Sequence, residues 1–106
     1  MGLAKEIYEL TTSFPGEEKF GLISQMRRAA VSVPSNIAEG HARNTTGEFI
    51  QFVSHAEGSL AELDTQLRLA QLLGLCPQVN TGSVSARITE LQKMLKSLRR
   101  SLGGAH

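Results

Sequence analysis

The chain has 106 residues, of which 41% are hydrophobic and 20% are charged, and its 11 basic and 10 acidic residues give a formal net charge of +1. This composition is typical of one soluble globular domain and excludes a disordered chain. No stretch approaches the roughly 18 consecutive apolar residues of a membrane span, and the charges in MGLAKEIYEL argue against a secretory signal. We therefore expect a single cytoplasmic domain over residues 1–106.

Apolar residues recur at alternating spacings of three and four in four segments, which is the pattern of amphipathic helices. The segments predict helices over residues 2–13, 17–42, 46–74 and 83–102. Pro15 and Gly16 follow the first, Thr45 and Glu48 form a capping box at the start of the third, and residues 80–83 offer a turn and an N-cap for the fourth. Short connections favour antiparallel neighbours, so the sequence predicts an all-α protein, an antiparallel up-down-up-down four-helix bundle.

The stretch SVPSNIAEGHAR, from Ser32 to Arg43, is unusual for the second predicted helix. Pro34 removes a backbone donor, which predicts a kink or local opening near Ala30, and Ser32 and Ser35 can bond to the groups that it frees. Glu39 stands four residues before Arg43, the spacing of a helical ion pair. We therefore interpret this stretch as a structural device rather than a catalytic site.

The second helix also carries more apolar surface than one face of a bundle requires, which predicts a contact with another subunit. Arg27 and Arg28 are a second candidate pair for nucleic acid, although Arg28 is better explained by a carboxylate partner at that subunit contact. The candidate motif, structural or interface residues are Arg27, Arg28, Ala29, Ser32, Pro34, Ser35, Asn36, Ala38, Glu39, Gly40 and Arg43.

Charge is distributed unevenly along the chain. From Ser83 onward five basic residues face one acidic residue, Glu90, for a net charge of +4, while the six basic and nine acidic residues before it give −3. The five are Arg87, Lys93, Lys96, Arg99 and Arg100. They are candidates for contact with a phosphate backbone, and the alternative is a solvated face whose cations suit a helix C-terminus.

Chemical motifs are largely missing from the sequence. A di-iron bundle needs Glu-x-x-His pairs, and neither His41 nor His55 has Glu three residues before it. His55 shares a face with Glu48 and Glu62, but about 10 Å of rise separates successive members, which is typical of a solvated column. Cys76 has no second cysteine to complete a disulfide or a metal motif. We expect no enzymatic activity, no cofactor and no metal.

Two longer stretches carry a family resemblance. FPGEEKFGLISQMRRAAVSVPSNIAEGHAR (Phe14 to Arg43) and EFIQFVSHAEGSLAELDTQL (Glu48 to Leu67) resemble the 23S rRNA intervening-sequence proteins. The resemblance implies a small four-helix bundle in a homopentameric ring with no established enzymatic activity. The chain is also similar to accessory proteins of diversity-generating retroelements, which associate with a reverse transcriptase and with nucleic acid. His41 and a short first helix depart from the family pattern.

Three functional hypotheses follow from these features. The first is a ring-forming bundle that presents its basic surface to RNA or DNA, or to a nucleic-acid enzyme such as a reverse transcriptase. The second is a structural or adaptor protein that organises a protein partner without nucleic acid. The third and weakest is a metal enzyme.

Overall fold

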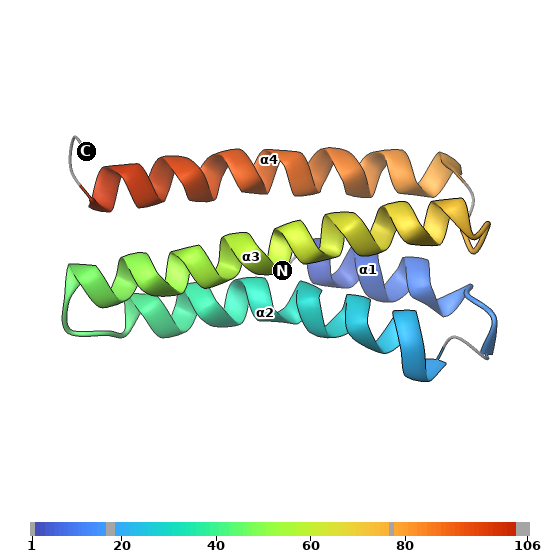
Figure 1. The fold of residues 1–106 in the computed structure, drawn as a ribbon, viewed down its shortest axis with the longest axis horizontal. Coiled ribbons are helices and arrows are strands. Elements are labelled where there is room, and N and C mark those ends of the chain that lie inside the picture. The colour runs from blue at the N-terminus through green and yellow to red at the C-terminus, as the bar shows by residue number, and fades with distance from the viewer. Residues whose placement is uncertain (1, 17–18, 77, 104–106) are drawn as a thin grey trace.

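The protein is described by a computed structural model that covers residues 2–16, 19–76 and 78–103. Four helices, α1 (Gly2–Thr12), α2 (Ser24–His41), α3 (Thr46–Leu72) and α4 (Gln78–Leu102), follow one another, and a short π-helical turn, η2 (Lys19–Ile23), precedes α2. Those residues contain no strand, so the all-α prediction is confirmed. Successive helices run in opposite directions (Figure 1).

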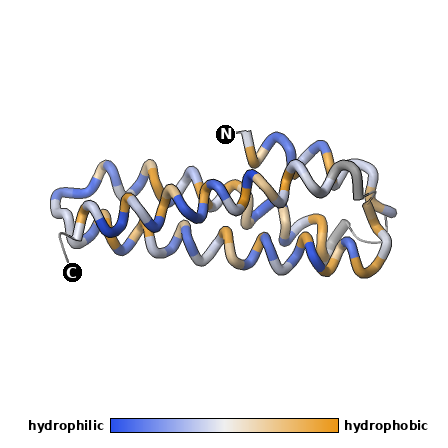
Figure 2. The backbone as a smooth tube through the Cα atoms, turned by 90° about the horizontal axis from the view of Figure 1, so that it is seen from above, coloured by the Kyte–Doolittle hydropathy of each residue, from blue (hydrophilic) through white to orange (hydrophobic). Residues whose placement is uncertain are grey.

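The four helices enclose one elongated core within a body of 44 × 22 × 18 Å. Each helix packs against two neighbours, because α2 contacts α3, α3 contacts α4, and α1 lies against both α2 and α4. Apolar positions recur along every helix (Figure 2). The fully buried large side chains of the core are Ile7, Met26, Val53, Leu60, Leu63, Leu67 and Ile88.

The helix α1 is much shorter than its neighbours. Its 11 residues span about 16 Å, whereas the 27 residues of α3 span about 40 Å. The N-terminus therefore lies about halfway along the bundle in both views (Figures 1 and 2). In the half of the bundle beyond Gly2, the residues that the structure describes form the three helices α2, α3 and α4.

The start of α4 differs from the sequence prediction. The helix begins at Gln78 rather than at residue 83, so the turn and N-cap predicted over residues 80–83 are wrong. Thr81 is buried and Val84 follows it on the same side of the helix. Tertiary packing thus extends the helix through residues that favour a turn locally.

The break in the second predicted helix lies elsewhere than expected. Helix α2 is continuous from Ser24 to His41 with Pro34 inside it, so the segment does not open near Ala30. The backbone leaves helical values at Gly21 instead, where φ is −104° and ψ is −107°. Ala30 and Val33 are buried in the core and hold this part of α2 in place despite the lost donor. Residues 17 and 18, the predicted start of this helix, lie outside the described residues.

The boundaries of α3 agree with its local signals. The Thr45 hydroxyl accepts a hydrogen bond from the Glu48 N–H at 3.1 Å and donates one to the Glu48 carboxylate at 2.9 Å, so the predicted capping box is confirmed. The helix ends at Leu72, two residues before the predicted end. Gly74 then adopts a left-handed φ of 70° that suits glycine.

Candidate nucleic-acid interface

The five basic residues of α4 fall into two groups. Arg87 forms an ion pair with Glu6 of α1. Arg99 donates to Glu57 of α3 through both Nε, 2.6 Å from Oε1, and Nη2, 3.3 Å from Oε2. The hydrogen bond to Glu57, and then its charge, raise the pKa of the Arg99 guanidinium. These two cations therefore connect α4 to its neighbours in the bundle.

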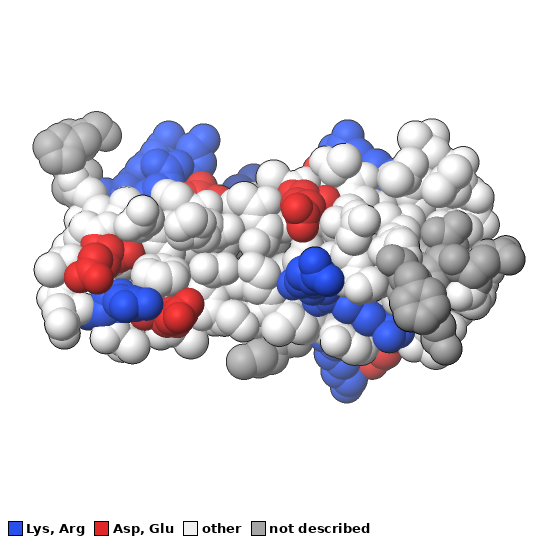
Figure 3. Space-filling view, turned by 60° about the horizontal axis from the view of Figure 1, so that its bottom comes forward, with Lys and Arg blue, Asp and Glu red and all other residues white. Residues whose placement is uncertain are grey.

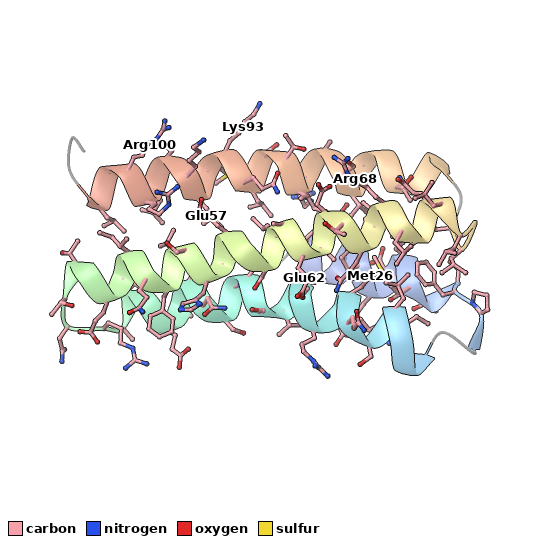
Figure 4. All side chains as sticks on the ribbon, viewed as in Figure 1. Met26, Glu57, Glu62, Arg68, Lys93 and Arg100 are labelled. Atoms are coloured by element: carbon pink, nitrogen blue, oxygen red, sulfur yellow. The ribbon has the colours of Figure 1, made fainter. Side chains whose placement is uncertain are left out.

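The other three cations, Lys93, Lys96 and Arg100, are all exposed. Lys93 and Arg100 point away from α3 (Figure 4). Lys96 lies between them in sequence, and the three span about 10 Å of helix rise. In the part of the chain that the structure describes, none of the three forms an ion pair. We call them the basic trio.

Helix α4 itself carries little negative charge. Glu90 is the sole acidic residue of α4. Basic side chains gather toward the C-terminal end of α4 at the upper left edge of Figure 3, whereas acidic and basic side chains are mixed over the rest of that face. The arrangement can attract phosphate groups, but it contains no nucleophile and base in contact.

The unusual stretch of α2 holds this helix against α3. Ser32 and Ser59 share a hydrogen bond of 2.7 Å between their hydroxyls, and the Asn36 amide donates to the Ser32 Oγ at 2.9 Å and to its carbonyl oxygen at 2.8 Å. Ser32 therefore does not serve the groups freed by Pro34, as the sequence suggested, and Ser35 is exposed. The predicted ion pair is confirmed, because Arg43 Nη2 lies 3.7 Å from Glu39 Oε1.

Helices α2 and α3 pack closely against each other at the buried Gly40. A Cβ atom at this position would lie 2.7 Å from Phe52 Cβ and 3.0 Å from Phe49 Cδ1. The Arg43 guanidinium then stacks 4.8 Å from the centre of the Phe52 ring. These contacts explain a glycine within a helix by packing.

Arg27 and Arg28 have different environments. Arg27 donates from Nε to the Thr11 hydroxyl at 2.8 Å and lies 4.6 Å above the centre of the Tyr8 ring, so it connects α2 to α1. Arg28 is exposed, and no carboxylate within the described residues forms an ion pair with it. Its pairing at a subunit contact remains a prediction.

The two alanines assigned to a subunit contact lie in different places. Ala29 is 2% exposed and belongs to the core of its own chain, whereas Ala38 is exposed and lines an apolar groove of about 680 Å³ between α2 and α4. The sequence did not indicate this groove, which lies beyond the N-terminal end of α1 at Gly2.

Metal-ligand side chains are dispersed. Across residues 2–16, 19–76 and 78–103, no three His, Cys, Asp or Glu side chains gather where they could hold a metal ion. His55 and Glu62 are exposed, and Glu48 is engaged in the cap of α3. None of the helices over these ranges combines the length and apolarity needed to cross a bilayer.

The fold and the basic trio define a class, that of small four-helix bundle proteins with three exposed cations on the last helix. The chain belongs to the 23S rRNA-intervening sequence protein family, whose model matches residues 1–97. Its fold is similar to the crystal structure of a protein of unknown function from the S23 ribosomal protein family of Bacteroides thetaiotaomicron, with a TM-score of 0.76 and 19% identity over 92% of this chain and 98% of that chain. No curated protein matches the chain.

Proposed function

We propose that this protein is a non-enzymatic, cytoplasmic, self-assembling bundle that binds nucleic acid through the basic trio. The observation that supports this function is the division of the α4 cations. Arg87 and Arg99 are matched by carboxylates, while Lys93, Lys96 and Arg100 are exposed without an ion pair among the described residues. Cations that serve only to stabilise the bundle would be expected to face its carboxylates.

The geometry of the trio fits the spacing of phosphates. Its rise of about 10 Å corresponds to about three phosphates along one strand of B-DNA. Three phosphate contacts per copy predict a slope of log K against log salt of about −2.7 for duplex DNA and about −2.1 for a single strand. The described residues of α4 include no aromatic side chain on which bases could stack, so the proposal is for backbone binding with little sequence preference.

The test compares two triple variants with the same change in net charge. Lys93→Gln, Lys96→Gln and Arg100→Gln together remove the trio, and Lys5→Gln, Arg43→Gln and Arg68→Gln remove three exposed cations elsewhere. Binding to short duplex and single-stranded DNA and RNA is measured by fluorescence anisotropy across a salt titration.

We expect the first variant to lose the salt-dependent binding and the second to keep it. An equal loss in both variants, or binding of the wild type that does not change with salt, would contradict the proposal. RNA is the first ligand to test, because the family description refers to an intervening sequence of 23S rRNA.

Self-assembly of this small domain is part of the proposal, with a pentameric ring as the expected form. Assembly would multiply the basic trio around one particle and raise its affinity for a continuous phosphate backbone. A nucleic-acid enzyme such as a reverse transcriptase is the proposed protein partner, recruited through the same nucleic acid.

The alternative function is that of an adaptor that organises a protein partner without nucleic acid. The exposed apolar side chains of Leu72, Leu73 and Met94 favour it, because a soluble bundle gains nothing from exposing them. A protein partner that is still retained on the purified protein after nuclease treatment, together with no binding of nucleic acid at low salt, would favour the adaptor.

A further inference from the structure

The guanidinium of Arg99 has two edges, each of which can hold an anion through a pair of parallel hydrogen bonds. On one edge, Nε and Nη2 donate to the two carboxylate oxygens of Glu57 at 2.6 and 3.3 Å. Nη1 and the second N–H of Nη2 form the other edge, to which no acceptor among the described residues is bound. The Arg99 side chain is 37% exposed, so a ligand in solvent can reach it. We call this second edge the open edge.

Two cations of the basic trio lie beside Arg99 on α4. Lys96 precedes Arg99 by three residues and Arg100 by four, and residues at these spacings are neighbours on a helix surface. Both are exposed. Figure 4 shows Glu57 beneath α4, at a point along the bundle between Lys93 and Arg100. Lys96, Arg99 and Arg100 therefore form one compact group within little more than a helical turn, which we call the end cluster.

The charge of the end cluster exceeds that of an internal phosphate of a strand. Its three positive charges and the one negative charge of Glu57 leave a net charge of +2. An internal phosphodiester carries one negative charge and has two free oxygens, which the open edge of Arg99 alone would occupy. A phosphate monoester carries a charge of about −1.5 to −2 near pH 7 and has three acceptor oxygens. Two of these oxygens fit the open edge, and the third is left to accept from Lys96.

Glu57 holds Arg99 ready for such a ligand. Because the carboxylate fixes Nε and Nη2, the open edge keeps one orientation and loses little freedom when an anion binds. The carboxylate also reduces the positive charge that a singly charged phosphodiester meets at Arg99. The pair thus favours an anion that carries more than one charge.

We propose that the end cluster binds the terminal phosphate monoester of a nucleic acid strand, with the phosphate on the open edge of Arg99 and beside Lys96 and Arg100. Lys93, about one turn earlier on α4, then lies beside the next phosphate of the same strand. This inference rests on the proposed function, because it assigns one end of the basic trio to one end of the bound strand.

The test compares ends of one strand. A short single-stranded RNA of fixed sequence is prepared with a 5′ phosphate, with a 3′ phosphate, or with hydroxyl groups at both ends. An internal fluorophore leaves the ends free, and binding is measured by fluorescence anisotropy at low salt near neutral pH. We expect a phosphate-ended form to bind wild type about three to ten times more tightly than the hydroxyl-ended form, the range for charge-assisted hydrogen bonds at an exposed site. A preference for either end supports the inference and identifies that end.

Two variants with the same change in net charge locate the preference. Arg99→Gln removes the open edge, whereas Arg87→Gln removes the other arginine of α4 that pairs with a carboxylate, that of Glu6 on α1. We expect Arg99→Gln to bind the three RNA forms equally and Arg87→Gln, the matched control, to keep the wild-type preference. Circular dichroism checks that both variants keep the helical fold.

Arg99→Lys separates the shape of the guanidinium from its charge. The ammonium group keeps the positive charge but cannot offer two parallel donors in a fixed plane. We therefore expect this variant to lose most of the preference for phosphate-ended RNA while still binding the hydroxyl-ended form through the basic trio. Inorganic phosphate is added to wild type as a competitor, and we expect it to displace phosphate-ended RNA only far above the RNA concentration, since the trio also holds the strand.

Several results would overturn the inference. These are equal binding of the three RNA forms by wild type, a full preference kept by Arg99→Gln or Arg99→Lys, and a loss in Arg87→Gln as large as in Arg99→Gln. Inorganic phosphate that competes as tightly as phosphate-ended RNA would show that free phosphate, rather than a strand end, is the ligand. If hydroxyl-ended RNA still binds through the basic trio, the proposed function stands in all of these cases. The absence of binding of every RNA form at low salt would overturn both.

Discussion

Arg99 of α4 and Glu57 of α3 form a two-point contact, with Nε 2.6 Å from Oε1 and Nη2 3.3 Å from Oε2. The parallel arrangement of donors and acceptors is one that an arginine makes with a carboxylate and a lysine cannot reproduce. It holds one cation of α4 against the bundle. The size of the basic surface of α4 therefore depends on Glu57 as well as on the cations themselves.

Replacing Glu57 with Gln should enlarge the basic surface. The amide keeps the shape of the side chain but removes the charge that holds Arg99, so Arg99 becomes a fourth cation beside the basic trio. We expect tighter binding of duplex DNA at low salt and a slope of log K against log salt steeper by about 0.9. Anisotropy across a salt titration measures both quantities.

Glu62→Gln is the matched control, because Glu62 is exposed on α3 and has no ion pair within the described ranges. It makes the same change in net charge without releasing an arginine. If both variants strengthen binding equally, net charge is the cause and the release of Arg99 has no special effect.

The cations of α4 also show how far the sequence could predict the site. Periodicity places Lys93, Lys96 and Arg100 on the outer face, and all three are exposed. Arg87 and Arg99 could not be separated from them, because their carboxylate partners are on other helices and the pairing exists only after the bundle forms. Charge counts along a sequence include both kinds of cation.

The fold was predictable where apolar spacing and local capping agree. The capping box of Thr45 and Glu48 is one example, and the row of buried apolar residues along α3 is another. Where the two signals compete, tertiary packing decides, as at Thr81, which is buried within α4 although its neighbours favour a turn. The groove could not be predicted from any one segment, because residues of three helices line it.

We expect Gly40, the glycine of α2, to tolerate no side chain. An added Cβ would approach Phe52 Cβ to 2.7 Å, so α2 and α3 would have to separate. Although alanine is the better helix former, we expect Gly40→Ala to destabilise the fold by about 1–3 kcal/mol, the range for overpacking. The free energy of unfolding is measured by urea denaturation.

Gly58→Ala is the matched control within a helix, and we expect it to stabilise the fold rather than destabilise it. Gly58 is exposed on α3 and a Cβ there would meet nothing within 4 Å. This variant should gain about 0.5–1 kcal/mol from helix propensity. A loss of stability at Gly58, or a gain at Gly40, would show that the spacing of α2 and α3 differs from the one described.

Pro34→Ala should stabilise the isolated chain. Pro34 leaves the carbonyl of Ala30 without its helical donor, and alanine restores this N–H within a helix that is already continuous. The gain in helix propensity is partly offset by the greater freedom of the unfolded chain, so we expect a net gain of about 1–2 kcal/mol. The measurement is the urea midpoint, at a concentration where the protein is monomeric.

Ser35→Ala is the control for this change, because Ser35 is the exposed neighbour of Pro34, and its effect should stay within about 0.5 kcal/mol. A Pro34→Ala variant that is less stable than wild type would mean that packing of the proline ring outweighs the lost hydrogen bond. Because Pro34 lines the groove, the mass of the Pro34→Ala variant in solution is compared with that of wild type in the same experiment.

Cys76 should react slowly in the folded protein, because burial raises the pKa of its thiol. Alkylation by iodoacetamide near the ordinary thiol pKa of about 8.5 should be slower in the native protein than in urea.

The raised pKa of the Cys76 thiol also makes the stability of the fold depend on pH. The unfolded chain loses this proton first, so the stabilising contribution is complete below the ordinary thiol pKa and is lost as pH rises through the raised pKa of the folded state. Cys76→Ala should remove that component from the change in urea midpoint between neutral pH and about pH 10. An identical pH dependence in wild type and Cys76→Ala, or equal alkylation rates with and without urea, would show that the thiol is open to solvent.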